Sequence, residues 1–122
     1  MTADDLIGAW KLEGWDAINE QNETIQPYGD APGGFIMYTP DGYMSAQIRG
    51  NGGDGVTPEG LFLAYAGPYE IDGETVIHKV EIANWHPLVG SDQPRQASFD
   101  GDQLTLSAEA RGLRHFIRWR KT

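Results

Sequence analysis

The chain contains no cysteine, and this absence excludes disulfide bonds, thiolate catalysis and cysteine metal sites together. No run approaches the roughly 18 apolar residues that a membrane-spanning helix needs. The acidic segment 1–5 lacks the apolar core of a signal peptide, which favours a cytoplasmic protein. Three signatures of common chemistry are also missing: the dinucleotide-binding glycine pattern, the serine hydrolase elbow and closely spaced metal-binding histidines. We therefore expect no cofactor and no metal.

Basic residues are scarce over most of the chain. Residues 1–110 hold 4 Lys and Arg against all 18 Asp and Glu, whereas residues 111–122 hold the remaining 5 basic residues. An acidic body repels phosphate backbones, so nucleic-acid binding is disfavoured. The basic C-terminal segment is interleaved with Phe116, Ile117 and Trp119. This alternation indicates a packed last strand whose charges face acidic neighbours, in preference to an RNA-binding arm.

The length of 122 residues fits a single domain spanning residues 1–122. Asp-Gly pairs at 41–42, 72–73 and 100–101 each separate two β-prone runs, which is a strong hairpin signal. The pattern predicts eight strands, at about 7–18, 34–39, 43–49, 67–72, 75–83, 93–99, 103–109 and 113–120. With almost no helical periodicity, they favour an all-β fold, an eight-stranded antiparallel up-and-down barrel without exposed edges. A β-sandwich is the alternative.

One short helix is expected between the third and fourth of these strands. Thr57, Pro58 and Glu59 offer an N-cap, a proline at the first helical position and an acid in the first turn. Residues 61–65 then supply an apolar turn or two, and the glycine-rich segment 50–55 precedes them. Segment 50–60 is predicted either to form a mobile flap beside a barrel mouth or to be a plain connection.

Two polar side chains are expected to face the barrel interior. Strand alternation places His78 on the inward face of its run, together with Val76, Val80 and Ile82. It places Arg95 on the inward face of the following run, together with Ala97 and Phe99. Buried charges need partners or a ligand. Each residue either lines a cavity or has a structural role: a neutral core histidine bonded to a tyrosine or carbonyl, and an arginine in an ion pair that closes one barrel end.

Aromatic residues supply further candidates for ligand binding. Four tyrosines surround the first hairpin and the predicted flap: Tyr38, Tyr43, Tyr65 and Tyr69. A buried tyrosine hydroxyl needs a partner, although ordinary barrel packing accounts for about half of such residues. Trp85 lies in segment 84–90, which breaks the strand pattern with bulky residues. It is predicted to cover an entrance or to plug it.

Several segments together resemble the bacterial lipocalin-like domain family. The most specific is residues 38–45, of sequence YTPDGYMS, and Gly8-Ala9-Trp10 is similar to the Gly-x-Trp opening of calycin barrels. Further similar segments are residues 64–67, 69–73, His78, 89–90 with Gln93 and Arg95, 101–106 and 119–120. The chain departs from the family pattern after Gly50, where it is shorter, and at residues 85–88, which rearrange the usual Pro-Asn-Trp order.

The resemblance implies an eight-stranded barrel with a central cavity, in agreement with the turn pattern. It implies that Trp10 plugs the closed end, with Arg118 or Arg120 stacked over it. His78 and Arg95 both fall at positions that the family pattern carries. Relatives with the calycin shape include carriers and cofactor-free enzymes, so the resemblance does not identify a substrate.

We expect a barrel that takes one small, largely apolar molecule and carries out cofactor-free isomerisation, cyclisation or elimination. His78 is the candidate general acid or base, because an ordinary histidine pKa near 6.5 suits neutral pH. Arg95 is the candidate for stabilising an enolate or carboxylate, and Tyr43 or Tyr65 for donating a hydrogen bond.

Two other functions fit the same sequence. One is a non-catalytic carrier or sensor of a hydrophobic ligand, and the other is a structural interaction protein whose own side chains fill the interior. No nucleic-acid or membrane partner is expected. A homodimer formed through outward apolar residues such as Trp15 or Ile77 is compatible with the pattern.

Overall fold

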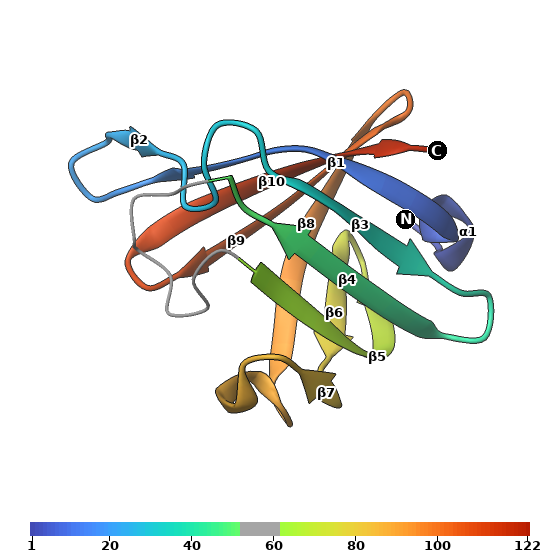
Figure 1. Cartoon of the computed structure of the whole chain (residues 1–122). Helices are drawn as coiled ribbons and strands as arrows, with labels where there is room; N and C mark the ends of the chain where they lie inside the picture. The colour runs from blue at the N-terminus through green and yellow to red at the C-terminus, as the bar shows by residue number, and fades with distance from the viewer. Residues whose placement is uncertain (52–61) are drawn as a thin grey trace.

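Successive strands pair antiparallel around the molecule until the last strand meets the first (Figure 1). The computed structural model describes residues 1–51 and 62–122. Eight strands close the barrel: β1 (Gly8–Ile18), β3 (Gly33–Tyr38), β4 (Tyr43–Arg49), β5 (Phe62–Asp72), β6 (Thr75–Lys79), β8 (Asp92–Asp100), β9 (Gln103–Ala110) and β10 (Leu113–Lys121). Two short strands, β2 (Thr24–Ile25) and β7 (Ile82–Ala83), pair with β1 and β5. The predicted eight-stranded barrel is confirmed.

The Asp-Gly hairpins are also confirmed. Gly42, Gly73 and Gly101 lie between paired strands with φ of 94°, 63° and 59°. These left-handed conformations suit glycine because it has no Cβ. The turns therefore follow from local chemistry, and they fix which strands are neighbours.

The predicted short helix is wrong for residues 62–65, the part of it that the structure describes. Residues 62–65 belong to β5, because Arg49 to Ala46 of β4 pair with them one by one. This cross-strand pairing replaces the apolar helical turn that the sequence favoured. Residues 57–61 of the predicted helix and residues 52–60 of the predicted flap lie outside the described residues. Among the described residues, the helices are α1 (Ala3–Leu6) and the 3₁₀ turn η1 (His86–Leu88), and none is long and apolar enough to cross a membrane.

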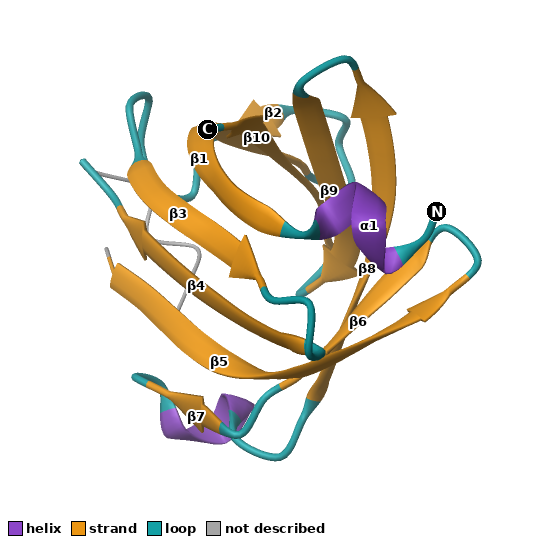
Figure 2. Ribbon diagram, turned by 90° about the vertical axis from the view of Figure 1, so that its right-hand side faces the viewer, coloured by secondary structure: helices purple, strands orange, loops and turns teal. Residues whose placement is uncertain are grey.

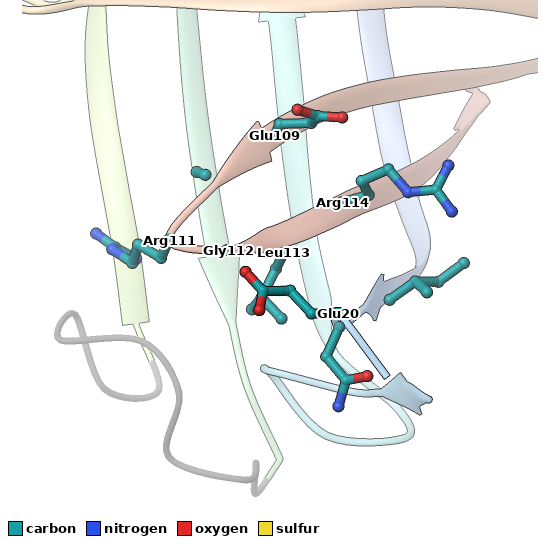
Figure 3. Close-up of a pocket in the computed structure, with 9 residues that line it drawn as sticks. Glu20, Glu109, Arg111, Gly112, Leu113 and Arg114 are labelled. Carbon is teal, nitrogen blue, oxygen red and sulfur yellow. The ribbon is translucent and has the colours of Figure 1, made fainter. Parts of the chain in front are cut away.

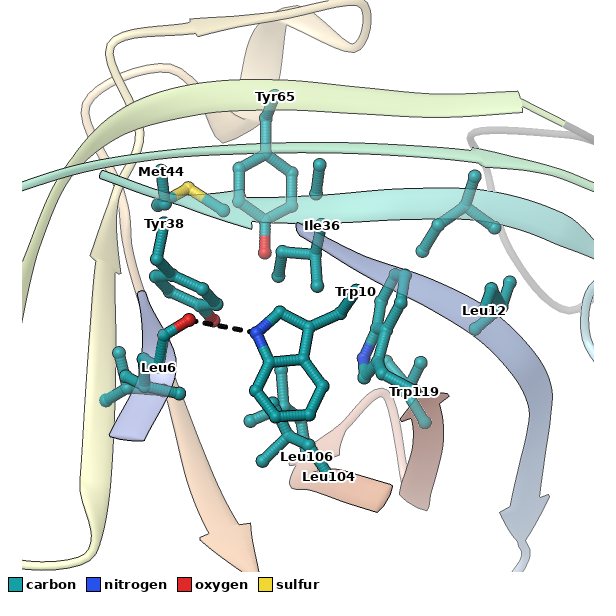
Figure 4. Packing of buried hydrophobic residues seen from close by; sticks show 14 of the residues in the cluster. Leu6, Trp10, Leu12, Ile36, Tyr38, Met44, Tyr65, Leu104, Leu106 and Trp119 are labelled. Atoms are coloured by element: carbon teal, nitrogen blue, oxygen red, sulfur yellow. Dashed lines mark hydrogen bonds between the residues drawn. The ribbon is translucent and has the colours of Figure 1, made fainter. Parts of the chain in front are cut away.

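The α1 helix lies across one end of the barrel, which we call the closed end (Figure 2). Leu6 is fully buried there, and its carbonyl oxygen accepts a hydrogen bond of 2.9 Å from Trp10 Nε1 (Figure 4). Trp10 is buried, as expected for a plug. The cation over its ring is Lys121, with Nζ 4.6 Å from the ring centroid. The expectation of Arg118 or Arg120 there is wrong.

Arg118 and Arg120 instead connect the last strand to the first. Arg118 Nη1 lies 2.7 Å from Asp16 Oδ2, and Arg120 Nε lies 2.9 Å from Glu13 Oε2. Both arginines pair across the β1–β10 seam, on the outer face of the barrel. The prediction that the basic strand faces acidic neighbours is confirmed.

Trp15 points inward, against the expectation that it lies on the outer surface. The register between β1 and β10 shifts by one residue between Leu12 and Gly14. Such a bulge reverses the inward and outward alternation beyond it. Leu12 and Trp15 are therefore both buried, although residues three apart in a regular strand face opposite sides. Trp15 is unavailable as a dimer contact.

Ile82 is exposed for the same kind of reason. β6 pairs with β5 through Tyr69 and His78, but β7 pairs with β5 through Ala66 and Ile82, a register that differs by one residue. The change occurs beside Gly67, where a Cβ would lie 1.9 Å from the Lys79 carbonyl oxygen. Ile82 is 67% exposed in consequence, and its predicted inward position is wrong.

Replacing Gly67 by Ala should destabilise the protein, because the new methyl group overlaps backbone atoms that have no room to move without breaking strand pairing. We expect a loss of about 2 kcal/mol or more in the free energy of unfolding. Urea unfolding followed by tryptophan fluorescence measures this loss. Ala64→Ser, on the same strand, is the control and should stay within about 0.5 kcal/mol of the wild type. A Gly67→Ala protein as stable as the wild type would contradict the close approach of the two backbones.

Candidate functional site

A cavity of about 280 Å³ lies near the last residues of β1 and the β9–β10 turn, whereas α1 precedes the start of β1. We call this the open end of the barrel. The walls of the cavity come from β1, β5, β8, β9, β10 and the segment around η1. The apolar lining residues are Trp15, Leu63, Trp85, Leu88, Ala108, Ala110 and Ile117. The polar ones are Tyr65, Gln93, Arg95, Arg111 and His115. The cavity therefore combines two indole rings and aliphatic walls with a few polar groups, as small-molecule sites do.

A larger hollow of about 470 Å³ lies on the rim beside the β9–β10 turn (Figure 3). Its lining includes Glu20, Glu109, Arg111 and Arg114. It is an open surface depression, and of the candidate site residues none lines it. The interior cavity is the stronger candidate because it is more enclosed and holds three of them.

His78 lies behind the cavity wall, bonded to two tyrosines. Its Nε2 is 2.7 Å from the Tyr38 hydroxyl oxygen, and its Nδ1 is 2.7 Å from the Tyr65 hydroxyl oxygen. His78 is 1% exposed and does not line the cavity, whereas Tyr65 does. Three strands, β3, β5 and β6, thus build a buried chain of hydroxyl, imidazole and hydroxyl, which we call the Tyr–His–Tyr chain.

Burial sets the protonation state of this chain. Desolvation, with the nearby Arg95 charge, lowers the pKa of His78 from 6.5 to about 3, so the imidazole is neutral at neutral pH. Desolvation also raises the pKa of Tyr38 and Tyr65, so both hydroxyls keep their hydrogen. The geometry agrees with the interpretation of His78 as a neutral histidine bonded to tyrosine.

Arg95 faces the cavity and is half-buried. Its Nη1 donates to the Pro94 carbonyl oxygen at 2.9 Å, and its Nη2 donates to Gln93 Oε1 at 3.3 Å. No carboxylate of the described residues lies within 4.0 Å of its guanidinium. The alternative of an ion pair that closes one barrel end is therefore absent from the described part of the chain.

Trp85 lies at the rim of the cavity, under an arginine. The Arg111 guanidinium carbon is 5.1 Å from the centroid of the Trp85 ring, within the range of a cation–π contact. Trp85 comes from the loop before η1, and Arg111 comes from the β9–β10 turn. The pair joins two loops at the open end.

The remaining tyrosine candidates lie toward the closed end. Tyr43 is 51% exposed and does not line the cavity. Tyr69 donates from its hydroxyl to the Thr39 carbonyl oxygen at 3.0 Å, and its ring packs edge-on against Tyr38. The structure therefore brings Tyr65, Trp85 and Arg95 together and leaves Tyr43 and Tyr69 elsewhere.

The sequence prediction missed Trp15, Gln93 and His115 as cavity residues. Trp15 Nε1 donates to His115 Nδ1 at 3.0 Å, and the Trp15 ring stacks on Tyr28 with centroids 4.4 Å apart. The β1 bulge hid Trp15, but simple alternation in the last strand puts His115 on the same face as Ile117 and Trp119. That signal was present in the sequence.

The barrel and its cavity define a class of β-barrel proteins whose fold suggests small-molecule binding. The chain belongs to the lipocalin-like domain family, whose model matches residues 7–122. No curated protein matches the chain.

Two solved structures share the fold. A lipocalin-like protein from Bacteroides uniformis is 16% identical, with a TM-score of 0.55, over 97% of this chain and 99% of that one. An uncharacterized protein from Bacteroides eggerthii is 11% identical, with a TM-score of 0.53, over 97% of this chain and 100% of that one.

The lowered pKa of His78 predicts a pH-dependent stability. Because the folded-state pKa of about 3 lies below the unfolded value of 6.5, the unfolded chain takes up the proton first. Stability that is fully present above pH 6.5 is therefore lost as the pH falls toward 3. Between pH 6 and 4, the free energy of unfolding of the wild type should fall by about 1.4 kcal/mol per pH unit more than that of His78→Gln.

Urea unfolding at several pH values measures the difference. His86→Gln removes an exposed histidine and should keep the wild-type pH dependence. If His78→Gln does not fold, the NMR shift of the His78 Cε1–H group in the wild type serves instead, and it should remain that of a neutral imidazole at pH 5. A midpoint near pH 6.5 for this signal would contradict the buried neutral state.

Proposed function

We propose that the barrel binds one small, mostly apolar molecule in the cavity at its open end. The observation that carries this proposal is the cavity of about 280 Å³ between Trp15, Trp85 and aliphatic side chains. Its volume is near the lower end of the range of about 300–1,000 Å³ found for ligand sites. A ligand of one or two rings, or a short alkyl chain, matches this space.

The cavity argues against a purely structural role. A structural interaction protein is expected to fill its interior, because protein cores are packed about as densely as organic crystals. The half of the barrel toward the closed end meets that expectation, with Trp10, Ile36, Leu104 and Trp119 packed together (Figure 4). The open-end half does not. The unfilled space coincides with the polar groups of Tyr65 and Arg95, which favours a ligand site.

A cofactor-free isomerase, cyclase or lyase is the second candidate. The observation in its favour is that Tyr65 and Arg95 line the same cavity, because a hydroxyl and a guanidinium are suited to stabilise negative charge on a substrate oxygen. His78 is poorly suited to be the base. Its pKa of about 3 makes it weakly basic, and both nitrogens are bonded to tyrosines. Binding without turnover is therefore the better supported function.

Filling the cavity should abolish binding. Ala108→Leu adds bulk to the cavity wall and should weaken 1:1 binding of small aromatic or alkyl compounds by about tenfold or more. Native mass spectrometry and calorimetry measure this binding. The ligands are octanol, octanoate and octylamine, and 2-naphthalenemethanol, 2-naphthoate and 2-naphthalenemethylamine. Ser107→Leu adds the same bulk on the opposite face of β9 and should bind as the wild type does. Equal binding by both variants would exclude the cavity as the site.

Turnover distinguishes the two candidates. Compounds that bind 1:1 should be recovered unchanged after prolonged incubation with stoichiometric protein, as judged by NMR and chromatography, which detect isomers. A compound that is converted, with the rate reduced about a hundredfold or more in Tyr65→Phe, would instead establish the enzyme. Tyr43→Phe, which removes the hydroxyl of an exposed tyrosine outside the cavity, is the matched control and should leave the rate unchanged.

A further inference from the structure

The cavity has an unusual charge for this protein. The chain has 18 Asp and Glu against 9 Lys and Arg, yet no acid belongs to the described lining of the cavity. The charged residues in that lining are Arg95 and Arg111, both cations. An apolar wall lowers the local dielectric and strengthens the interaction of such charges with a ligand. Within the described lining, the charged residues are therefore opposite in sign to the net charge of the molecule.

The hydrogen bonds already made within the protein determine which polar groups of the cavity can bind a ligand. Gln93 Oε1 accepts from Arg95, and Gln93 Nε2 donates to Ser91 Oγ at 2.9 Å. His115 Nδ1 accepts from the Trp15 indole, so in the neutral ring the hydrogen is on Nε2 and this nitrogen is a donor. The side-chain acceptors of Gln93 and His115 are thus already engaged within the protein. Arg95 has only donors, and its two protein bonds leave three of its five N–H groups.

The Tyr–His–Tyr chain determines what Tyr65 offers. Tyr38 is 2% exposed, and among residues 1–51 and 62–122 its hydroxyl has a single hydrogen-bond partner, His78 Nε2. If Nε2 carried the hydrogen, the Tyr38 hydroxyl hydrogen would be buried without an acceptor, which costs about 1–3 kcal/mol. Tyr38 therefore donates to a bare Nε2, and the neutral imidazole carries its hydrogen on Nδ1. Nδ1–H then donates to the Tyr65 oxygen, so the hydroxyl hydrogen of Tyr65, a residue of the cavity lining, has no acceptor among the described residues.

We propose that the ligand is an apolar acid whose carboxylate is bound by the Arg95 guanidinium and the Tyr65 hydroxyl. The inference rests on the proposed binding function and adds the ligand class. A carboxylate supplies acceptors only, which matches the three N–H groups that Arg95 has left after its two protein bonds. Its two oxygens also fit the planar fork of a guanidinium. An amine or a purely apolar molecule leaves these donors without partners.

Matched ligand series test the ligand class. Calorimetry compares 2-naphthoate, 2-naphthalenemethanol and 2-naphthalenemethylamine, and likewise octanoate, octanol and octylamine. In at least one series the carboxylate should bind about tenfold or more tightly than the alcohol, with the amine weakest. Arg95→Gln should reduce the ratio of carboxylate to alcohol affinity to near one while leaving alcohol binding in place.

Controls separate this inference from the proposed function. Arg49→Gln removes an exposed cation outside the cavity and should keep the carboxylate preference. Alcohols or amines that bind as well as the carboxylates would overturn the inference and leave the proposed function standing. A full carboxylate preference in Arg95→Gln would also overturn it. Binding by none of the six compounds would count against both.

The role of Tyr65 has its own readout. Two-bond ¹H–¹⁵N spectra of the wild type should show His78 with its hydrogen on Nδ1 and a bare Nε2, and carboxylate binding should leave that tautomer unchanged. Tyr65→Phe should weaken the carboxylate by about threefold to tenfold relative to the alcohol. A hydrogen on Nε2 would overturn the assignment of Tyr65 as a donor to the ligand, because its hydroxyl would then donate to His78.

Discussion

The pairing of β1 with β10 is the interaction on which the cavity depends. It runs from Trp10 opposite Lys121 to Ile18 opposite Arg114 and closes the sheet on itself. The two ion pairs across this seam are accessible to solvent, and such pairs contribute little to stability. Their main effect is on register, since a slip by one residue would place Asp16 and Glu13 away from their arginines. Closure in this register brings Trp15 against His115, which together form one wall of the cavity.

Local sequence signals predicted the barrel well because they act over few residues. Asp-Gly turns fixed the hairpins, and period-two alternation placed His78 and Arg95 inward, whereas Tyr65 was assigned to a helix and lies in β5. The two errors of face, Trp15 and Ile82, both follow a one-residue register shift. At the second shift, Gly67 permits a backbone approach that a Cβ would block. A glycine inside a strand is compatible with such a shift but does not identify its direction, so alternation alone could not foresee either reversal.

The position of an inward side chain along the barrel axis is a second property that strand alternation does not predict. Tyr38, Tyr65 and Tyr69 are all buried, yet only Tyr65 lines the cavity. The meeting of Tyr38 and Tyr65 on opposite nitrogens of one imidazole joins strands that are 40 and 13 residues from His78 in sequence. Strand register determines such contacts, and register depends on the whole sheet. The sequence could therefore suggest a tyrosine partner for His78, but not that two tyrosines bind its two nitrogens.

The acidic residues behind the net charge of −9 and the arginines of the cavity lie at different distances from a ligand in the cavity. At physiological ionic strength the Debye length is about 8 Å, so acids spread over the outer surface are largely screened from a ligand inside the barrel. The Arg95 charge is not screened in this way, because it faces the cavity directly; burial lowers the pKa of His78 most, and the Arg95 charge lowers it further. Composition describes the average surface, whereas the chemistry of the site depends on a few donors that strand alternation turns inward. An acidic protein is for this reason compatible with an anionic ligand.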